Sequence, residues 1–227
     1  MKKIIIVLLV LLVTVPVSAN LFIKVGGGYG LSNQKYLLEQ VSNSDSYENI
    51  YASFGGNLGL HIGAGIDLNP HVELGTDLGY QHGRSVSTSS FFFEKTYTGR
   101  LIYLSPSLTF KTMIDEDLTP YGRLGFFTGL PIMNLDVNGD IKKFRGGLPL
   151  GVNGAIGSNY NLSENIVLFG EIYHQSMLYA PGKRKEDSGT VTFKDILPND
   201  APDSEEIRHH FFSYGAIGIN IGIKIVL

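Results

Sequence analysis

Apolar residues alternate with small or polar residues along the C-terminal segment of the chain, and this pattern constrains the fold more than any other feature. Successive side chains of a β-strand point to opposite faces of a sheet, so the segment predicts a strand with one fully apolar face. A strict period of two favours an all-β fold. The apolar positions are Ile217, Ile219, Ile221, Ile223, Ile225 and Leu227, and between them lie Gly218, Asn220, Gly222 and Lys224.

Eight segments carry this alternation, and short and long connections follow one another between them. The segments cover about residues 21–30, 54–68, 71–83, 97–113, 120–133, 148–162, 165–179 and 207–227. Asn69-Pro70, Asp115-Glu116-Asp117 and Ser163-Glu164 give the short connections tight-turn chemistry. The long connections are 31–53, 84–96, 134–147 and 180–206. This order is typical of outer-membrane barrels, which have short periplasmic turns and longer external loops. A further hairpin at 189–197 would make ten strands.

The face opposite the apolar one is mostly glycine with a few charges. A surface in contact with water would carry many Lys, Glu, Ser and Thr, whereas the lumen of a narrow barrel needs small residues. We therefore predict a closed, antiparallel up-and-down transmembrane β-barrel with its apolar face towards lipid. A soluble lipocalin-like barrel, with the reverse polarity, is the alternative.

The ionisable residues of the predicted inner face are balanced in charge. A closed interior requires such balance, because an unpaired buried charge is costly. Val167 and Phe169 share a face with an acidic residue, which leaves the orientation of their segment open, and Arg100 falls on the lipid side. We expect a lumen charge network of Lys24, Lys111, Arg123 and Lys224 with Asp67, Glu73, Asp77 and Glu171.

The N-terminus predicts export. Lys2 and Lys3 precede an apolar run at residues 4–13, and Val17-Ser18-Ala19 is a small-residue cleavage site. These are the parts of a secretory signal peptide, so we expect a signal peptide at 1–19 and a barrel domain at 20–227. An uncleaved anchor is the alternative, although the apolar run is short for a spanning helix.

The composition narrows the function. The chain has no cysteine, which excludes disulfides, thiolate metal sites and lipoprotein acylation. Its net charge of -3 argues against binding of nucleic acid. Tyrosine and phenylalanine are abundant, at 12 and 13 residues, and interfacial aromatic girdles are expected in such barrels. The candidates for the girdle are Tyr29, Tyr80, Tyr97, Tyr160, Tyr179, Tyr214 and Phe91-Phe92-Phe93.

The pattern resembles the small outer-membrane proteins: the OmpA transmembrane domain, OmpX, OmpW and the opacity proteins. The glycine-rich opening Lys24-Val25-Gly26-Gly27-Gly28-Tyr29-Gly30 and Thr119-Pro120-Tyr121 carry the resemblance. It implies a barrel of the cell outer membrane with a structural or surface-interaction role, without cofactor or enzymatic activity, and we expect a monomer. A narrow channel or carrier for small hydrophobic molecules, as in OmpW, is the alternative.

One short motif suggests chemistry. His174-Gln175-Ser176 is similar to the His-x-Ser element of lipid A deacylases of the PagL type, with Glu186 as the only obvious downstream acid. Met177 stands where those enzymes have Asn, and two interfacial polar residues explain the motif equally well. His209 and His210 point to opposite faces of a strand, so we expect no metal site.

The long connections are the expected contact surfaces. The last one holds Lys183-Arg184-Lys185, followed by acidic residues up to Glu206. These charges could contact lipopolysaccharide phosphates or divalent cations. We expect partners in outer-membrane lipid or lipopolysaccharide, and an extracellular ligand on the loops.

Overall fold

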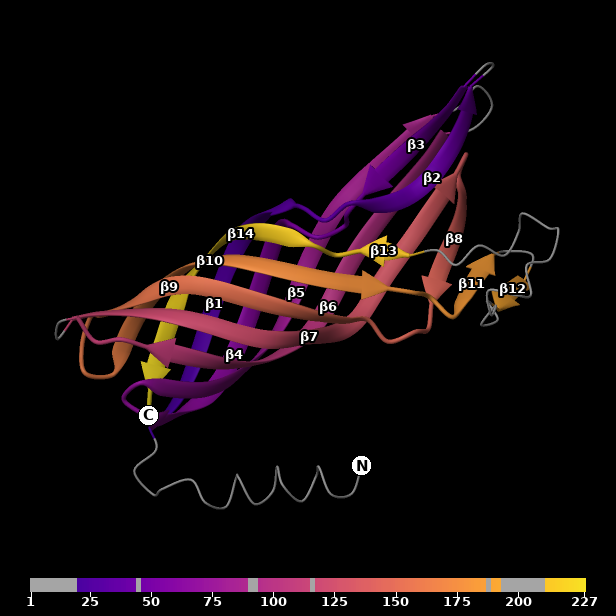
Figure 1. Cartoon of the computed structure of the whole chain (residues 1–227). Helices are drawn as coiled ribbons and strands as arrows, with labels where there is room; N and C mark the ends of the chain where they lie inside the picture. Colours follow the sequence, from indigo (N-terminus) through magenta and orange to yellow (C-terminus); the bar gives the residue numbers. More distant parts are fainter. Residues whose placement is uncertain (1–19, 44–45, 90–93, 115–116, 187–188, 193–210) are drawn as a thin grey trace, which may run out of the picture.

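In a computed structural model, which describes residues 20–43, 46–89, 94–114, 117–186, 189–192 and 211–227, long antiparallel strands close into a barrel (Figure 1). Each barrel strand pairs with the next, and the last pairs with the first, so the ring has eight members. They are β1 (Leu21–Ser32), β4 (Asn57–Asn69), β5 (Val72–Ser89), β6 (Glu94–Lys111), β7 (Leu118–Val137), β9 (Leu150–Asn161), β10 (Ile166–Tyr179) and β14 (Ala216–Val226).

The predicted short connections Asn69-Pro70 and Ser163-Glu164 lie at one end of the barrel, together with Asp117 of the third. The turn between β4 and β5 is held by the Asn69 side chain, which accepts a hydrogen bond of 2.8 Å from the His71 N–H. The start of β1 is hydrogen-bonded to both of its neighbouring strands at this end. The Asp67 N–H donates to the Asn20 carbonyl, and the Leu227 N–H donates to the Leu21 carbonyl. We call this the short-turn end, and the opposite end the long-connection end.

The long connections contain more β-structure than the sequence predicted. A separate hairpin, β2 (Tyr36–Asn43) and β3 (Ser46–Ala52), occupies the first of them. β7 turns into β8 (Asp140–Arg145) through Asn138-Gly139, whose φ angles of 51° and 94° suit a type I′ hairpin turn. β11 (Lys183–Glu186) pairs with β8, and β12 (Gly189–Thr192) pairs with β11. Apart from the further hairpin considered at 189–197, these segments were wrongly expected to be loops.

The barrel has eight strands rather than ten. The hairpin β11–β12 adds to β8, beyond the ring, so it does not widen the lumen. Residues 193–197 of the predicted hairpin lie outside the described residues. The prediction of an all-β, closed antiparallel barrel is confirmed.

Two segments predicted as barrel strand depart from the regular ring. Residues 54–56 precede β4 and form no strand, whereas residues 211–215 precede β14, contain the short β13 (Phe212–Ser213) and stay paired with β10 in the register of β14. The two segments are hydrogen-bonded to each other, since the Phe54 N–H donates to the Ser213 carbonyl at 2.7 Å. Phe54 is buried against Gly99 on the inner face of β6, so residues 54–56 turn into the barrel. Phe212 is buried because it continues the inward-facing positions of β14. Residues 207–210 lie outside the described part of the chain.

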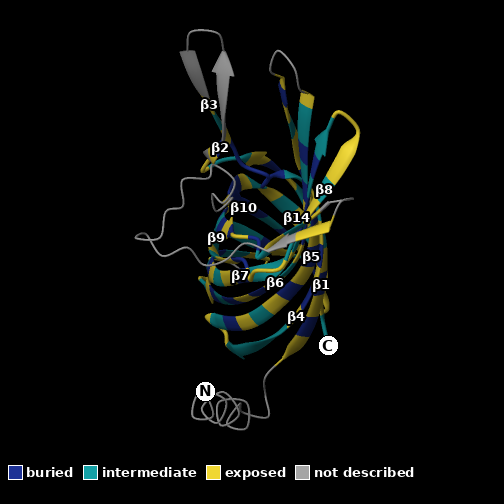
Figure 2. Ribbon diagram, turned by 90° about the vertical axis from the view of Figure 1, so that its right-hand side faces the viewer, coloured by how far each residue is buried: buried dark blue, intermediate teal, exposed yellow. Residues whose placement is uncertain are grey.

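Burial alternates along the barrel strands as the sequence predicted (Figure 2). On β14 Ile219 and Ile221 are 59% and 67% exposed, whereas Lys224 on the other face is 5% exposed. The apolar face is therefore the outer one and the charged face the inner one, which excludes the lipocalin-like polarity. No helix in the described ranges is long and apolar enough to cross a membrane.

Candidate functional site

The half of the lumen nearer the short turns holds charged residues. The structure places all eight ionisable residues assigned to the inner face in this part of the lumen, and none of their side chains is more than 19% exposed. Strand parity explains this, because each follows the inward-facing positions of its own strand. Val167 and Phe169 are also buried, which settles that the inner face of β10 includes them together with Glu171.

Arg123 on β7 lies at the centre of the network. Its guanidinium donates from Nη1 to Asp77 Oδ2 at 3.2 Å, and from Nε to Glu171 Oε2 at 3.2 Å, while Nη2 donates to Glu171 Oε1. Glu171 also accepts hydrogen bonds from the Tyr121 hydroxyl and the Asn220 amide, both at 3.0 Å. A forked arginine contact of this kind fixes geometry as well as charge.

The three lysines complete the network towards the short-turn end. Lys24 and Lys224 are direct cross-strand partners on β1 and β14. Like charges placed opposite each other are destabilising unless they are neutralised. Lys24 Nζ lies 3.0 Å from Asp77 Oδ1, and Lys224 Nζ donates to Glu73 Oε2 at 2.6 Å. Lys111 pairs with Asp67, so every cation of the network has a carboxylate.

Gly63 on β4 leaves the space that the Lys24–Asp77 ion pair occupies. A Cβ atom there would lie 2.1 Å from Asp77 Oδ1 and 2.8 Å from Lys24 Cε. We expect Gly63→Val to lower the free energy of unfolding by about 1–3 kcal/mol, measured by urea unfolding in detergent micelles. Gly122→Val is the control, because nothing lies within 4 Å of a Cβ at that outward position. Equal losses in the two variants would contradict the explanation.

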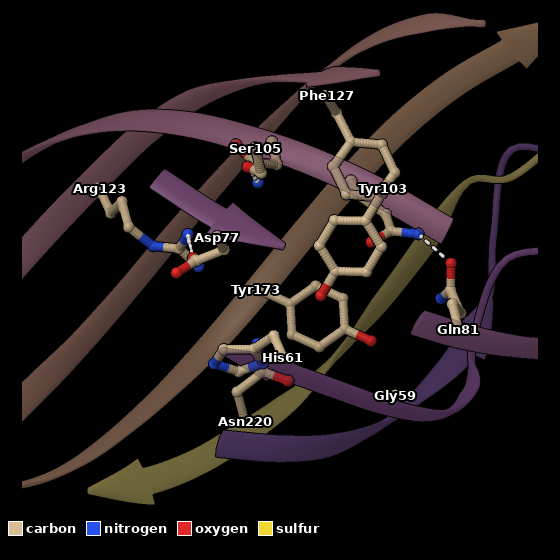
Figure 3. A pocket seen from close by; sticks show the side chains of 12 residues that line it. Gly59, His61, Asp77, Gln81, Tyr103, Ser105, Arg123, Phe127, Tyr173 and Asn220 are labelled. Carbon is tan, nitrogen blue, oxygen red and sulfur yellow. Dashed lines mark hydrogen bonds and ion pairs between the residues drawn. The ribbon is translucent and has the colours of Figure 1, made fainter. Parts of the chain in front are cut away.

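A small cavity lies above the network (Figure 3). Its volume is about 30 Å³, enough to hold a water molecule but no larger ligand. Arg123 and Asp77 stand at one side and Gln81 at the other, where Gln81 Oε1 accepts a hydrogen bond of 2.9 Å from Gln175 Nε2. His61 also lines the cavity, and its ring centroid is 6.1 Å from that of Phe169.

The lumen nearer the long-connection end is closed by packed aromatic side chains, which we call the apolar plug. Residues 54–56 supply Phe54, and residues 211–215 supply Phe212 and Tyr214, all at most 1% exposed. Phe212 lies 5.8 Å from Phe54 and 5.0 Å from Phe144 of β8, both edge-to-face. The remaining buried residues of the plug are Leu38, Ala52, Tyr97, Leu101, Phe127, Met133, Leu135, Met177 and Tyr179.

The plug corrects part of the predicted aromatic girdle. Tyr97, Tyr179 and Tyr214 are inside the barrel because their strand positions have inward parity, whereas Tyr29 and Tyr160 are 59% and 47% exposed on the outer face. Tyr80 is also exposed, and residues 91–93 lie outside the described residues. The sequence carried a signal for the plug: Phe212, Tyr214 and Ala216 continue the inner face of β14 with apolar residues.

The His-x-Ser motif lies on the outer wall of β10. His174 is exposed, Ser176 is partly exposed, and Gln175 between them is buried in the lumen. No hydrogen bond joins His174 to Ser176 within the described residues, and the side chain of Glu186 lies outside them. Arg100 is exposed on the outer face, as its parity predicted.

A metal site is not formed by the described residues, none of which gather in groups of three or more His, Asp or Glu suited to an ion. His209 and His210 are outside these residues. An open mouth of about 860 Å³ lies at the short-turn end, lined by residues that include Asp67, Lys111 and Lys224. Water therefore reaches the charge network from this end.

The chain is similar to known proteins in sequence and in structure. The sequence matches the family described as outer membrane protein beta-barrel domain over residues 5–194. The structure is similar to a major outer membrane protein of Thermus thermophilus, at 13% identity and a TM-score of 0.54, covering 92% of this chain and 100% of that one. The neisserial surface protein A has 12% identity and a TM-score of 0.47, covering 92% and 99%. No curated protein matches in sequence.

The family match covers most of the chain and includes seven of the eight ring strands, while β14 lies beyond it. The Thermus likeness independently supports the fold. The chain belongs to the outer-membrane β-barrel protein family.

Proposed function

We propose that the protein is a non-conducting, non-enzymatic barrel that holds a rigid β-sheet surface outside the outer membrane. The filled lumen carries the proposal. Ion pairs close the half nearer the short-turn end, and the apolar plug closes the half nearer the long-connection end. Eight strands leave an interior just wide enough for side chains. Passage of solutes, as in the OmpW-like alternative, would require both levels to open.

The long-connection end is the surface that would meet partners. Outer-membrane barrels place their longer connections outside the cell, so this end faces outward in the proposal. The outer parts of β5, β6, β7 and β8 continue beyond the barrel as one sheet, with the β2–β3 hairpin as a separate projection (Figure 1). Hydrogen-bonded strands hold a fixed shape better than irregular loops, which suits contact with an extracellular ligand.

Planar-bilayer recording tests this proposal. We expect the purified, folded protein to give no sustained channel openings, while an open porin measured in the same bilayers conducts. The same samples should migrate faster unboiled than boiled on a denaturing gel, which shows that the barrel is closed and folded. Sustained openings from a folded sample would overturn the proposal in favour of a channel.

A further inference from the structure

Basic side chains gather on the outer face of the sheet that β8 and β11 add to the outer part of β7. Lys183 on β11 is directly opposite Arg145 on β8, and Lys185 is directly opposite Lys143. Arg145 is partly exposed and the three lysines are exposed. We call these four residues the basic ribbon.

The pair of strands that carries the basic ribbon, β8 and β11, has two different faces. Phe144 lies between Lys143 and Arg145 and points into the apolar plug, where it is fully buried. Arg184, its cross-strand partner, is on that same inner face. The plug therefore fixes which way the ribbon faces, and the four cations are held on the outer face of this sheet. Of the predicted Lys183-Arg184-Lys185 motif, only the two lysines belong to the outer surface.

Like charges directly opposite each other destabilise a strand pair, so the arrangement calls for a counter-ion. Among the described residues, none of the four cations forms an ion pair, and Arg145 Nη1 donates only to the neighbouring Phe144 carbonyl at 3.0 Å. The nearest acid on β7, Asp136, lies further towards the hairpin tip and accepts a hydrogen bond from the Gly139 N–H.

The position of the basic ribbon relative to the apolar band of the barrel indicates what the ribbon binds. Arg100 on β6 extends the basic surface, because it pairs with Ile132, next to Met133, which pairs with Phe144. Two residues below Arg100, an apolar row of the outer face begins with Ile102 and its cross-strand partners Tyr80 and Leu130, all exposed. The cations thus stand where the apolar belt ends, at the level of lipid head groups rather than at the hairpin tips.

We propose that the basic ribbon and Arg100 bind the phosphate groups of outer-leaflet lipids. Arginine and lysine side chains are the usual ligands of phosphate oxygens, and a membrane surface rich in anionic groups attracts such clusters. The site deepens the proposed function, since it rests on the outward placement of the long-connection end. Binding of lipid phosphate at this site would set the depth and tilt of the barrel in the membrane.

Titration of the folded protein in neutral detergent micelles with lipid A tests this site. The variant is Lys143→Gln/Arg145→Gln/Lys183→Gln/Lys185→Gln. The control is Lys35→Gln/Arg84→Gln, two exposed cations outside the ribbon. We expect the four-residue variant to lose at least about tenfold in affinity and the control to stay within about twofold. Dephosphorylated lipid A should bind weakly to all three proteins, and inorganic phosphate should not compete at equal concentration.

The outcomes separate this inference from the proposed function. Unchanged affinity in the four-residue variant would overturn the site, as would equal binding of dephosphorylated lipid A or an equal loss in the control. Competition by inorganic phosphate would assign the cations to a soluble anion instead. Channel openings from the wild-type protein would overturn the proposed function without changing the lipid titration. Heat-modifiable migration shows that each variant is folded before it is titrated.

Discussion

Arg123→Met is expected to lower the free energy of unfolding by about 3–5 kcal/mol, because it leaves two buried carboxylates without their shared cation. Asp77 and Glu171 both contact the guanidinium, and their side chains are 4% exposed. Methionine fills a similar volume, so the loss reports charge rather than a cavity. Urea unfolding in detergent micelles, followed by heat-modifiable migration and circular dichroism, measures the effect.

Two further variants separate charge pairing from loss of a side chain. Arg84→Met removes an exposed cation and should change stability by less than about 0.5 kcal/mol. Asp77→Asn/Arg123→Met/Glu171→Gln removes the carboxylates together with the cation and should recover most of the loss. If Arg123→Met alone costs less than about 1 kcal/mol, the centre of the network does not depend on the guanidinium.

Strand parity made the composition of this network predictable, but not its pairings. Parity shows that Lys24 and Asp77 face inward, because the side-chain period of a strand is two. Which acid meets which base depends on the stagger of the closed ring, and that is set by hydrogen-bond register between strands distant in sequence. Lys224 and Glu73, for example, are 151 residues apart in the chain.

The strands outside the ring could be predicted from the sequence only in part. Asn138-Gly139 is a strong signal for a two-residue hairpin and would have predicted the β7–β8 pair. β11 has no such signal: its residues Lys183-Arg184-Lys185-Glu186 read as a solvated charge run. Its strand geometry comes from pairing with β8, which is a tertiary contact that overrides local preference.

The second large effect is expected from Phe212→Ala. This change should lower the stability of the packed long-connection end by about 3–5 kcal/mol. Phe212 is 1% exposed and touches aromatic rings from three other segments: Phe54, Phe144 and Tyr179. Because these segments are not neighbours in the chain, they cannot collapse easily around the space that the ring leaves. Phe126→Ala is the matched control, since Phe126 is 73% exposed on the outer face and lipid fills its place.

The part of the structure that Phe212→Ala destabilises shows whether the apolar plug folds independently of the ring. Phe212 lies beyond the β1–β14 pairs that close the ring, and its backbone pairs with Tyr179 at the far end of β10. Phe212→Ala should therefore keep heat-modifiable migration while limited proteolysis of the long-connection end becomes faster. If unboiled Phe212→Ala instead migrates like the boiled sample, closure of the ring itself depends on the plug. The plug and the charge network would then be one cooperative unit, and both would be needed to keep the lumen shut.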